Sequence, residues 1–334
     1  MKRPWLLPFV PLFAAGVALH NLRIRLGWEP VRRLSWPVIS IGNLSTGGAG
    51  KTPLAVALAH LLAARGFYVD VLSRGYGRRS VVAARVLADG VAEDFGDEPL
   101  LLARQTGIPV FVGAERFDAG LLAESEMPQN QTGRPSVHLL DDGYQHRHLA
   151  RNIDILLLSR ADWQDVLLPA GDLREGRSAA RRASVLVIPS SEPEFDSELR
   201  AWGWQGPIWR LHRHMQLPPL PGPVAAFCGI ARPAQFFSGI RAAGSQIAVQ
   251  TEFRDHHRFA AADIYRLIAA AHAAGAAAFL TTEKDLVRLG SLGGVLRDSM
   301  PLFTAHLQVE LEDEADAIGW LLERLSPVAG QPPV

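Results

Sequence analysis

The chain has 334 residues, which at about 150 residues per domain corresponds to roughly two domains. Lys plus Arg and Asp plus Glu both number 34, so the formal charge is zero, and this excludes binding of nucleic acid through bulk positive charge. A hydrophobic fraction of 48% with 20% charged residues excludes a disordered chain, a collagen-like repeat and a polytopic membrane protein. A single cysteine, Cys228, excludes an internal disulfide and a cysteine-rich zinc site, and it favours a reducing compartment.

The N-terminal segment contains an uncharged, mostly apolar run, Trp5 to Leu19, after two basic residues. This run of 15 residues is shorter than the about 20 that a bilayer crossing needs, and prolines interrupt its first half. A signal peptide would explain the basic start but would carry the chain out of a reducing compartment. A helix from about Leu12 to Gly27, with basic Arg23 and Arg25, suits a membrane interface, and the same helix could instead pack on the protein's own core.

From Pro37 onward, short apolar strands alternate with longer helical stretches, which predicts a parallel sheet covered by helices. Strands are expected at residues 38–41, 68–72, 109–112, 137–140, 153–158 and 185–188. Leucines at helical spacing after residue 51 predict a helix that ends at Arg65-Gly66.

A proline-rich segment at residues 217–223 can continue neither a helix nor a central strand, so it predicts a linker or a stiff crossover. Beyond it we expect strands at 224–228, 277–281 and 302–307, helices at about 260–274 and 312–325, and a frayed tail at 328–334. The predicted organisation is an N-terminal helix region (1–35), a larger α/β domain (36–216) and a smaller C-terminal α/β domain (217–334).

The most informative segment lies between the first strand and the following helix and reads IGNLSTGGAGKT, from Ile41 to Thr52. Glycines allow a tight turn that aims backbone N–H groups inward, the helix N-terminus adds positive potential, Lys51 can reach the β and γ phosphates, and Thr52 can bind Mg²⁺. The strict G-x-x-x-x-G-K-[ST] pattern would place a glycine where this chain has Ser45, so the segment is similar to the GGxGKT form of some P-loop ATPases. A glycine-rich turn without nucleotide is the alternative. The residues expected to bind nucleotide are Thr46, Gly47, Gly48, Ala49, Gly50, Lys51 and Thr52.

Asp141 and Asp142 follow the strand expected at 137–140 and supply the acidic half of a nucleotide site. A carboxylate at this position can hold a metal directly or through water. Adjacent residues of an extended chain point to opposite sides, so one of the two faces the metal, and the sequence leaves open which one. A pair of solvated turn acids before Gly143 is the alternative.

Two further clusters carry candidate acid–base chemistry. Asp97 and Glu98 occupy a turn before a helix, where a carboxylate could accept a proton from an alcohol, although spacing alone favours ordinary helix-entry acids. Asp255, His256 and His257 could form a carboxylate–imidazole pair or a solvated turn. Arginines suited to phosphate oxygens gather in three loops, at positions 74, 78 and 79, 147 and 151, and 174, 177, 181 and 182.

In these segments and in several further short motifs, the chain resembles the tetraacyldisaccharide 4′-kinase family, the lipid A 4′-kinases, over about residues 4–325. Ala49 stands where that family usually has threonine, and Tyr144 where it often has phenylalanine; neither change removes a group that the mechanism needs. The matching blocks, in the family's order, are residues 42–53, 73–78, 96–99, 141–146, 168–175, 255–257 and 281–285.

The resemblance implies a P-loop NTPase-type parallel sheet flanked by helices, with a second, smaller α/β domain. It implies transfer of the γ-phosphoryl group of ATP to the 4′-hydroxyl of a tetraacylated glucosamine disaccharide 1-phosphate, with ATP and Mg²⁺ as cofactors. Lys51 would hold the β and γ phosphates, while Thr52 and an aspartate of the 141–142 pair would bind Mg²⁺, with Glu98 as a further candidate contact. Asp97 would accept the sugar proton.

The resemblance also implies that His256, preferred by a small margin over His257, pairs with Asp97 when the two domains close. The expected lining of the acceptor or nucleotide pocket is Arg74, Gln145, His146 and Arg174.

The implied partners are the lipid A precursor disaccharide and the cytoplasmic membrane surface, with no nucleic acid and no obligate protein partner. A lipid acceptor favours the interfacial helix, and thus peripheral or monotopic association with the cytoplasmic face of the inner membrane. The rival hypothesis is a nucleotide switch of the GGxGKT type that docks partners at the membrane. Residues 282–285 read TEKD rather than the guanine-reading [NT]-K-x-D order, which gives a GTP switch little support.

Overall fold

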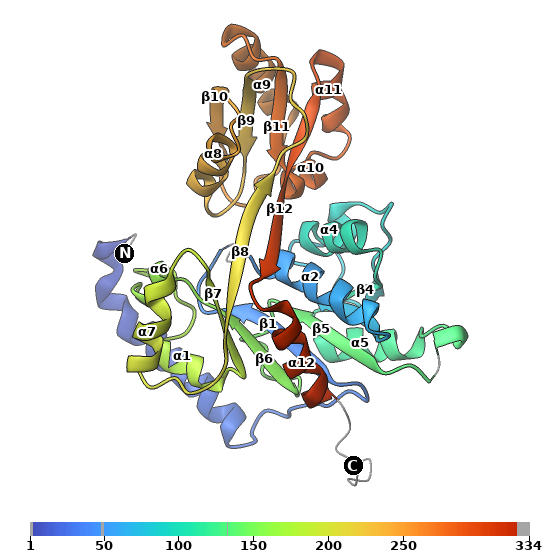
Figure 1. Cartoon of the computed structure of the whole chain (residues 1–334), viewed down its shortest axis with the longest axis vertical. Coiled ribbons are helices and arrows are strands. Elements are labelled where there is room, and N and C mark those ends of the chain that lie inside the picture. The colour runs from blue at the N-terminus through green and yellow to red at the C-terminus, as the bar shows by residue number, and fades with distance from the viewer. Residues whose placement is uncertain (1–2, 48–49, 132, 326–334) are drawn as a thin grey trace.

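The computed structural model describes residues 3–47, 50–131 and 133–325. Within these residues, twelve strands form one sheet in the order β10-β9-β11-β12-β8-β7-β6-β1-β5-β2-β4-β3 (Figure 1). The strands are β1 (Val38–Asn43), β2 (Tyr68–Ser73), β3 (Ala84–Arg85), β4 (Val110–Val112), β5 (Ser136–Asp141), β6 (Ile153–Leu157), β7 (Val185–Pro189), β8 (Ile208–Gln216), β9 (Val224–Cys228), β10 (Ile247–Glu252), β11 (Ala278–Thr282) and β12 (Leu302–Leu311).

Helices flank this sheet on both sides. The α-helices are α1 (Val10–Arg25), α2 (Lys51–Ala64), α3 (Ala92–Phe95), α4 (Asp97–Thr106), α5 (Arg116–Ser125), α6 (Arg160–Trp163), α7 (Pro193–Ala201), α8 (Pro233–Ala242), α9 (Ala261–Ala273), α10 (Glu283–Leu289), α11 (Leu292–Ser299) and α12 (Glu314–Leu325). The described residues also form the 3₁₀ helices η1 (Pro4–Phe9), η2 (Gln129–Gln131) and η3 (Arg177–Arg182).

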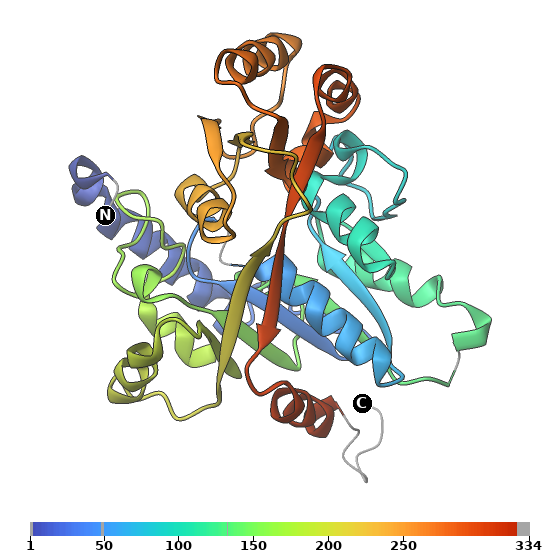
Figure 2. The same ribbon diagram turned by 45° about the horizontal axis from the view of Figure 1, so that its top comes forward.

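The sheet is bent into two lobes joined by β8 and β12 (Figures 1 and 2). The larger lobe holds β1 to β7, and the smaller lobe holds β9, β10 and β11 with helices α8 to α11. Neighbouring strands are parallel, except that β3 pairs antiparallel with β4 and β8 with β12. The carboxyl ends of the parallel strands, where open α/β sheets bind ligands, therefore face the region between the lobes.

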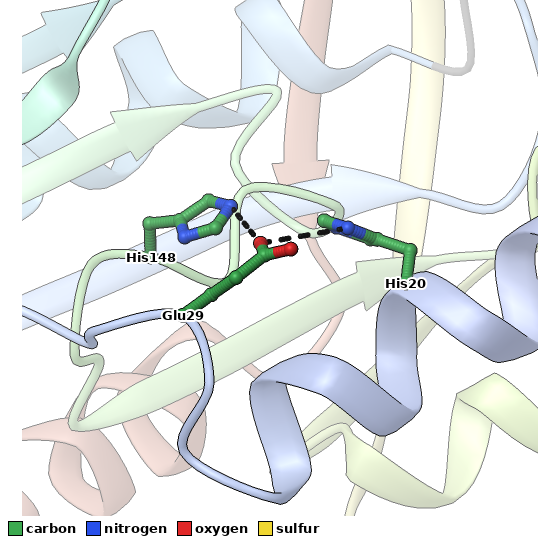
Figure 3. Close-up of side chains that lie close together, drawn as sticks. All are labelled: His20, Glu29 and His148. Atoms are coloured by element: carbon green, nitrogen blue, oxygen red, sulfur yellow. Dashed lines mark ion pairs between the residues drawn. The ribbon is translucent and has the colours of Figure 1, made fainter.

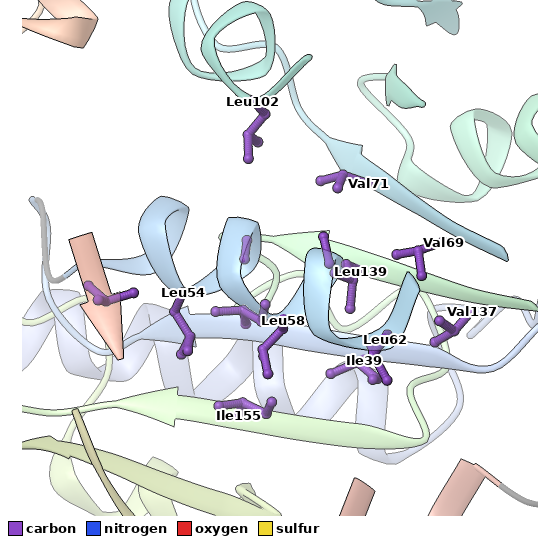
Figure 4. Packing of buried hydrophobic residues seen from close by; sticks show 14 of the residues in the cluster. Ile39, Leu54, Leu58, Leu62, Val69, Val71, Leu102, Val137, Leu139 and Ile155 are labelled. Carbon is purple, nitrogen blue, oxygen red and sulfur yellow. The ribbon is translucent and has the colours of Figure 1, made fainter. Parts of the chain in front are cut away.

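The core of the larger lobe lies between the central strands and α2. Leu54, Leu58 and Leu62 recur along one side of α2 and pack against strand residues such as Ile39 and Leu139 (Figure 4). All of β1 is buried, as expected for a parallel strand covered on both faces. The C-terminal helix α12 contributes to the same core through its buried apolar residues Ala317, Ile318, Leu321 and Leu325.

The predicted strands in both halves of the chain are present, with ends that differ by at most four residues. β12 extends to Leu311, beyond the predicted end at residue 307, because its second half pairs with β8. Residues 217–223 form neither helix nor strand and connect β8 to β9, as predicted. The sheet runs across the expected boundary at residue 217, and the division of the chain into three parts stays a prediction. The expected frayed tail, 328–334, lies outside the described residues.

The N-terminal segment is helical from Pro4 to Arg25, as η1 followed directly by α1. This helical segment covers 22 residues with a mean hydropathy of 1.5, so by length and composition it could cross a membrane. The apolar run of 15 residues had indicated a segment too short for such a crossing. Within its most apolar stretch none of the helix is buried, which argues against the interpretation as a core helix. The large apolar side chains exposed along this segment and just after it are Trp5, Leu7, Phe9, Leu12, Leu19, Leu22, Leu26 and Trp28.

Candidate active site

A cleft of about 1660 Å³ lies between the two lobes. Its floor is the glycine-rich loop, the start of α2 and the carboxyl ends of β2 and β5. Its other wall comes from the smaller lobe, through the loop after β9, the histidine turn near residue 256 and the start of α10. Nearly all the chemically informative blocks of the sequence meet in this space.

The glycine-rich loop follows β1 and leads into α2, whose first residue is Lys51. Gly47 and Gly50 have φ values of 112° and 89°, a left-handed conformation that glycine adopts without steric cost. The Lys51 ammonium donates hydrogen bonds to Asn43 Oδ1 at 3.0 Å and to the carbonyl of Gly47 at 3.4 Å. Thr52 is buried at the next position of α2. Thr46 lines the cleft, whereas Gly48 and Ala49 lie outside the described residues.

The smaller lobe lies directly over this loop. A Cβ atom at Gly47 would be 3.0 Å from the Cβ of Ala231, and one at Gly50 would be 3.4 Å from the guanidinium carbon of Arg213. Burial lowers the pKa of Arg213, which comes from β8 and also lines the cleft. Arg213 therefore places a positive charge beside the glycine-rich loop. Nothing in the local sequence distinguishes Arg213 from the other arginines of the chain, because only the fold brings it to this loop.

The two aspartates after β5 have different surroundings. Asp141 is buried, and among the described residues its Oδ1 atom has no hydrogen-bond partner. Burial, with the negative charges of Glu98 and Asp142, raises the pKa of Asp141 to about 7. Asp142 accepts hydrogen bonds from Arg174 at 3.0 and 3.1 Å and lies 3.3 Å from the Lys51 ammonium. Burial opposes ionisation of Asp142, but these two cations outweigh it and lower its pKa.

Asp97 is the first residue of α4 and lies at the boundary between the lobes. Its Oδ2 atom accepts a hydrogen bond from Arg288 Nε at 2.5 Å and is 3.1 Å from His256 Nδ1. Burial favours the protonated acid, but the hydrogen bond with His256 and the charge of Arg288 hold the pKa of Asp97 well below its usual range. The hydrogen bond with Asp97 in turn raises the pKa of His256.

Helix α10 supplies two cations that the sequence reasoning did not select. Lys284 forms an ion pair with Glu98, and Arg288 also donates to the carbonyl of Gly229 at 2.6 Å and to Asp285 Oδ1 at 3.1 Å. Lys284 and Arg288 are four residues apart, a spacing that places both on one face of a helix. This spacing is the only feature of the sequence that could have indicated that the two cations act together.

The structure also places the other residues that the sequence predicts for the site. His257 lies 2.9 Å from Asp263 Oδ2, so of the two adjacent histidines His256 is the one beside Asp97. Gln145 donates to the carbonyl of Asn43 at 2.9 Å and accepts from Arg174 at 3.3 Å.

Arg74 and His146 also line the cleft. Burial and the nearby charge of Arg116 lower the pKa of His146 to about 3, so its imidazole is neutral. Arg116 is itself buried, and burial lowers its pKa to about 10. This part of the cleft is therefore cationic and suited to an anionic ligand.

Comparisons with known proteins identify one family. A family model described as "Tetraacyldisaccharide-1-P 4'-kinase" matches residues 2–326. A protein named tetraacyldisaccharide 4'-kinase from Koribacter versatilis is 41% identical, over 93% of this chain and 95% of the relative. One of the same name from Anaeromyxobacter sp. (strain K) is 37% identical, over 98% of this chain and 92% of the relative.

The crystal structure of the "apo" form of LpxK from Aquifex aeolicus in complex with ATP is similar to the whole chain. Its TM-score is 0.74 at 30% identity, covering 96% of this chain and 98% of that one. The match extends over both lobes and includes the cleft. The chain therefore belongs to the tetraacyldisaccharide 4′-kinase family.

Proposed function

We propose that this chain transfers the γ-phosphoryl group of ATP to the 4′-hydroxyl of tetraacyldisaccharide 1-phosphate, a step of lipid A biosynthesis. The observation that carries the proposal is that the glycine-rich loop, Lys51 and His256 line one cleft, and that His256 lies 3.1 Å from the carboxylate of Asp97. Family membership and the ATP complex of a related protein support the same reaction.

The nucleotide side of the cleft is the glycine-rich loop. Backbone N–H groups at the start of α2 and the Lys51 ammonium hold the β and γ phosphates. In the structure Lys51 rests on Asn43 and Asp142, so these oxygens keep the ammonium in place near the loop. Arg213 supplies a further positive charge from above.

The donor set near Lys51 fits Mg²⁺, which prefers oxygen ligands. Asp141 offers a buried carboxylate oxygen without a hydrogen-bond partner among the described residues, whereas Asp142 is engaged by Arg174 and Lys51. We therefore assign the metal contact to Asp141, with the hydroxyl of Thr52, and Glu98 as the further candidate. Mg²⁺, when bound, neutralises charge on the β and γ phosphate oxygens.

The acceptor side uses Asp97. The 4′-hydroxyl oxygen attacks the γ-phosphorus, the bond from that phosphorus to the β–γ bridging oxygen breaks, ADP leaves, and the hydroxyl proton passes to Asp97. His256 hydrogen-bonds Asp97, and Arg288 orients it. Arg74, Gln145, His146 and Arg174 line the pocket for the anionic acceptor and the nucleotide.

The exposed apolar side chains of η1 and α1 support association with a lipid surface, where the acylated acceptor is found. We place the protein at the cytoplasmic face of the inner membrane, attached peripherally or monotopically. The basic residues Arg23 and Arg25 at the end of α1 suit an anionic leaflet.

The test is transfer of label from γ-labelled ATP to the lipid disaccharide, followed by chromatography. Lys51→Ala and Asp97→Ala should each lower turnover by at least about 100-fold, because each removes a group aimed at the transition state. Asp94→Ala, an exposed acid just before α4, is the matched control and should retain activity. Wild-type turnover in both site variants would refute the assigned roles. ATP hydrolysis without a labelled lipid would instead favour the nucleotide-switch hypothesis.

A further inference from the structure

Two histidines and a glutamate from three segments meet beside α1. His20 lies on α1, Glu29 follows that helix, and His148 lies in the loop after β5. In Figure 3 the two imidazole rings lie on either side of the Glu29 carboxylate, and the ligand atoms of the three residues are all within 4.8 Å of one another. The reaction proposed above assigns no role to any of the three.

The distances match those between the ligands of a metal ion. His148 Nε2 is 3.3 Å and His20 Nδ1 is 3.7 Å from the same oxygen, Glu29 Oε2. In a tetrahedral zinc site with bonds of about 2.0–2.1 Å, neighbouring ligand atoms are about 3.3 Å apart. Small side-chain rotations would therefore bring all three atoms to one ion.

The backbone holds these residues in place. After α1 the chain turns back, with hydrogen bonds of 3.0 Å from Gly27 N to the carbonyl of Ile24 and 2.9 Å from Trp28 N to that of Arg23. Arg32 N donates to the carbonyl of His148 at 2.8 Å, which fixes the loop beside this segment. Glu29 and His148 are thus brought together by main-chain contacts, independently of their side chains.

The Glu29 carboxylate is also oriented. Arg23 Nε lies 3.1 Å from Oε1, the oxygen that does not face the histidines. This contact leaves Oε2 directed at the two imidazole nitrogens, as an outer partner orients a metal ligand.

We propose that His20, Glu29 and His148 form a Zn²⁺ site, with water in the fourth position. Two imidazole nitrogens and one carboxylate oxygen suit zinc, whereas magnesium prefers oxygen alone. Bound zinc would join α1 to the loop that carries Gln145 and His146, and so connect the apolar helix to the wall of the cleft. The proposal does not depend on the kinase reaction.

The experiment is calorimetric titration of the full-length, chelator-treated protein with Zn²⁺, in excess Mg²⁺ and without ATP. The wild-type protein should bind one equivalent of Zn²⁺, and the His20→Ala and Glu29→Gln variants should lose this binding. Because loss of an outer partner already weakens metal binding about 10- to 100-fold, loss of a ligand should cost at least about 100-fold. His272→Ala, an exposed helix histidine, is the control and should bind like wild type.

Co²⁺ provides a second measurement, because a tetrahedral site gives visible d–d absorption that the two ligand variants should lack. Circular dichroism checks that each variant is folded. Absence of zinc binding by the wild-type protein, or equal zinc affinity in His20→Ala, Glu29→Gln and His272→Ala, would overturn the proposal and leave the cluster as an ion-pair network around Glu29.

Discussion

Arg288 and Asp97 are 191 positions apart in the sequence, yet Arg288 Nε lies 2.5 Å from Asp97 Oδ2. Both side chains are buried, and Arg288 also contacts Asp285 and the carbonyl of Gly229 in the smaller lobe. The guanidinium therefore fixes the orientation of a carboxylate that belongs to the larger lobe. This makes Arg288 a positioning residue for the proposed proton acceptor.

Replacing Arg288 should lower turnover without a comparable loss of nucleotide binding. We expect Arg288→Ala to reduce kcat by about 10- to 100-fold while the KM for ATP changes little, because misplacing a reacting group by about 1 Å can cost about 100-fold. Arg288→Lys keeps the charge and should recover part of the loss. Steady-state kinetics measure kcat and the KM for ATP separately. Arg297→Ala, which replaces an exposed arginine, is the control. An unchanged kcat in Arg288→Ala would contradict the role.

Gly42 should tolerate no side chain. A Cβ atom there would lie 2.5 Å from the Cβ of Tyr144 and 2.9 Å from its backbone nitrogen, so β1 or the Tyr144 loop must shift. Gly42→Ala is expected to lower the free energy of unfolding by about 1–3 kcal/mol or more. Gly319→Ala, on α12 with open space around it, should be neutral or stabilising by up to about 1 kcal/mol. Urea unfolding measures the free energy of unfolding of both variants. Equal values for Gly42→Ala and Gly319→Ala would contradict the prediction.

The buried histidine of β5 should make stability depend on pH. His138 Nδ1 lies 2.8 Å from Asp70 Oδ1 and its Nε2 lies 3.4 Å from Glu124 Oε1. Burial opposes the charged imidazole, but these carboxylates raise the pKa of His138 to about 9. The stabilisation is complete below the unfolded pKa of about 6.5 and is lost as pH rises through 9, by up to about 3 kcal/mol.

Urea unfolding at several pH values between 6 and about 10 tests this dependence. His138→Gln should be less stable at pH 6 and should show a flatter profile across the window. His272→Gln, which alters an exposed histidine, should keep the wild-type slope. A wild-type slope in His138→Gln would show that another group is responsible.

The apolar side chains of α1 should govern lipid association. Leu12 and Leu19 are 75% and 57% exposed, and replacing both by glutamine removes apolar surface from the proposed membrane face. We expect at least about tenfold weaker sedimentation with vesicles containing anionic lipid, at unchanged ATP affinity. Tyr265→Gln, a similarly exposed apolar position on α9, is the control. Equal vesicle binding by the double variant and the control would reject α1 as the contact.

Local chemistry made much of the larger lobe predictable. Strands such as β1 and β5 are short and apolar because both faces are buried, and the glycine-rich loop between β1 and α2 has a composition that few other structures require. β8 was not predicted, because residues 212–216 alternate between exposed and half-buried positions and carry two histidines and an arginine. Such a segment has no apolar run by which to recognise it.

The site residues that the sequence did not predict were missed for one physical reason. Arg288, Lys284 and Arg213 act through contacts with residues far away in the sequence, and their own neighbours resemble ordinary helix or strand surface. The fold alone brings Arg288 to Asp97. Similarly, the choice between Asp141 and Asp142 depends on Arg174, which comes from another loop.

The pairing of β8 with β12 limits how the width of the cleft can change. Residues 212–216 and 306–310 pair with each other, while the flanking parts of these strands join β7 and β11. A two-stranded ribbon twists more readily than a wide sheet, but sliding one lobe past the other would break its hydrogen bonds. The ribbon therefore restrains the lobes from sliding along it, whereas a rotation about it would move His256 and Arg288 of the smaller lobe away from Asp97 of the larger lobe.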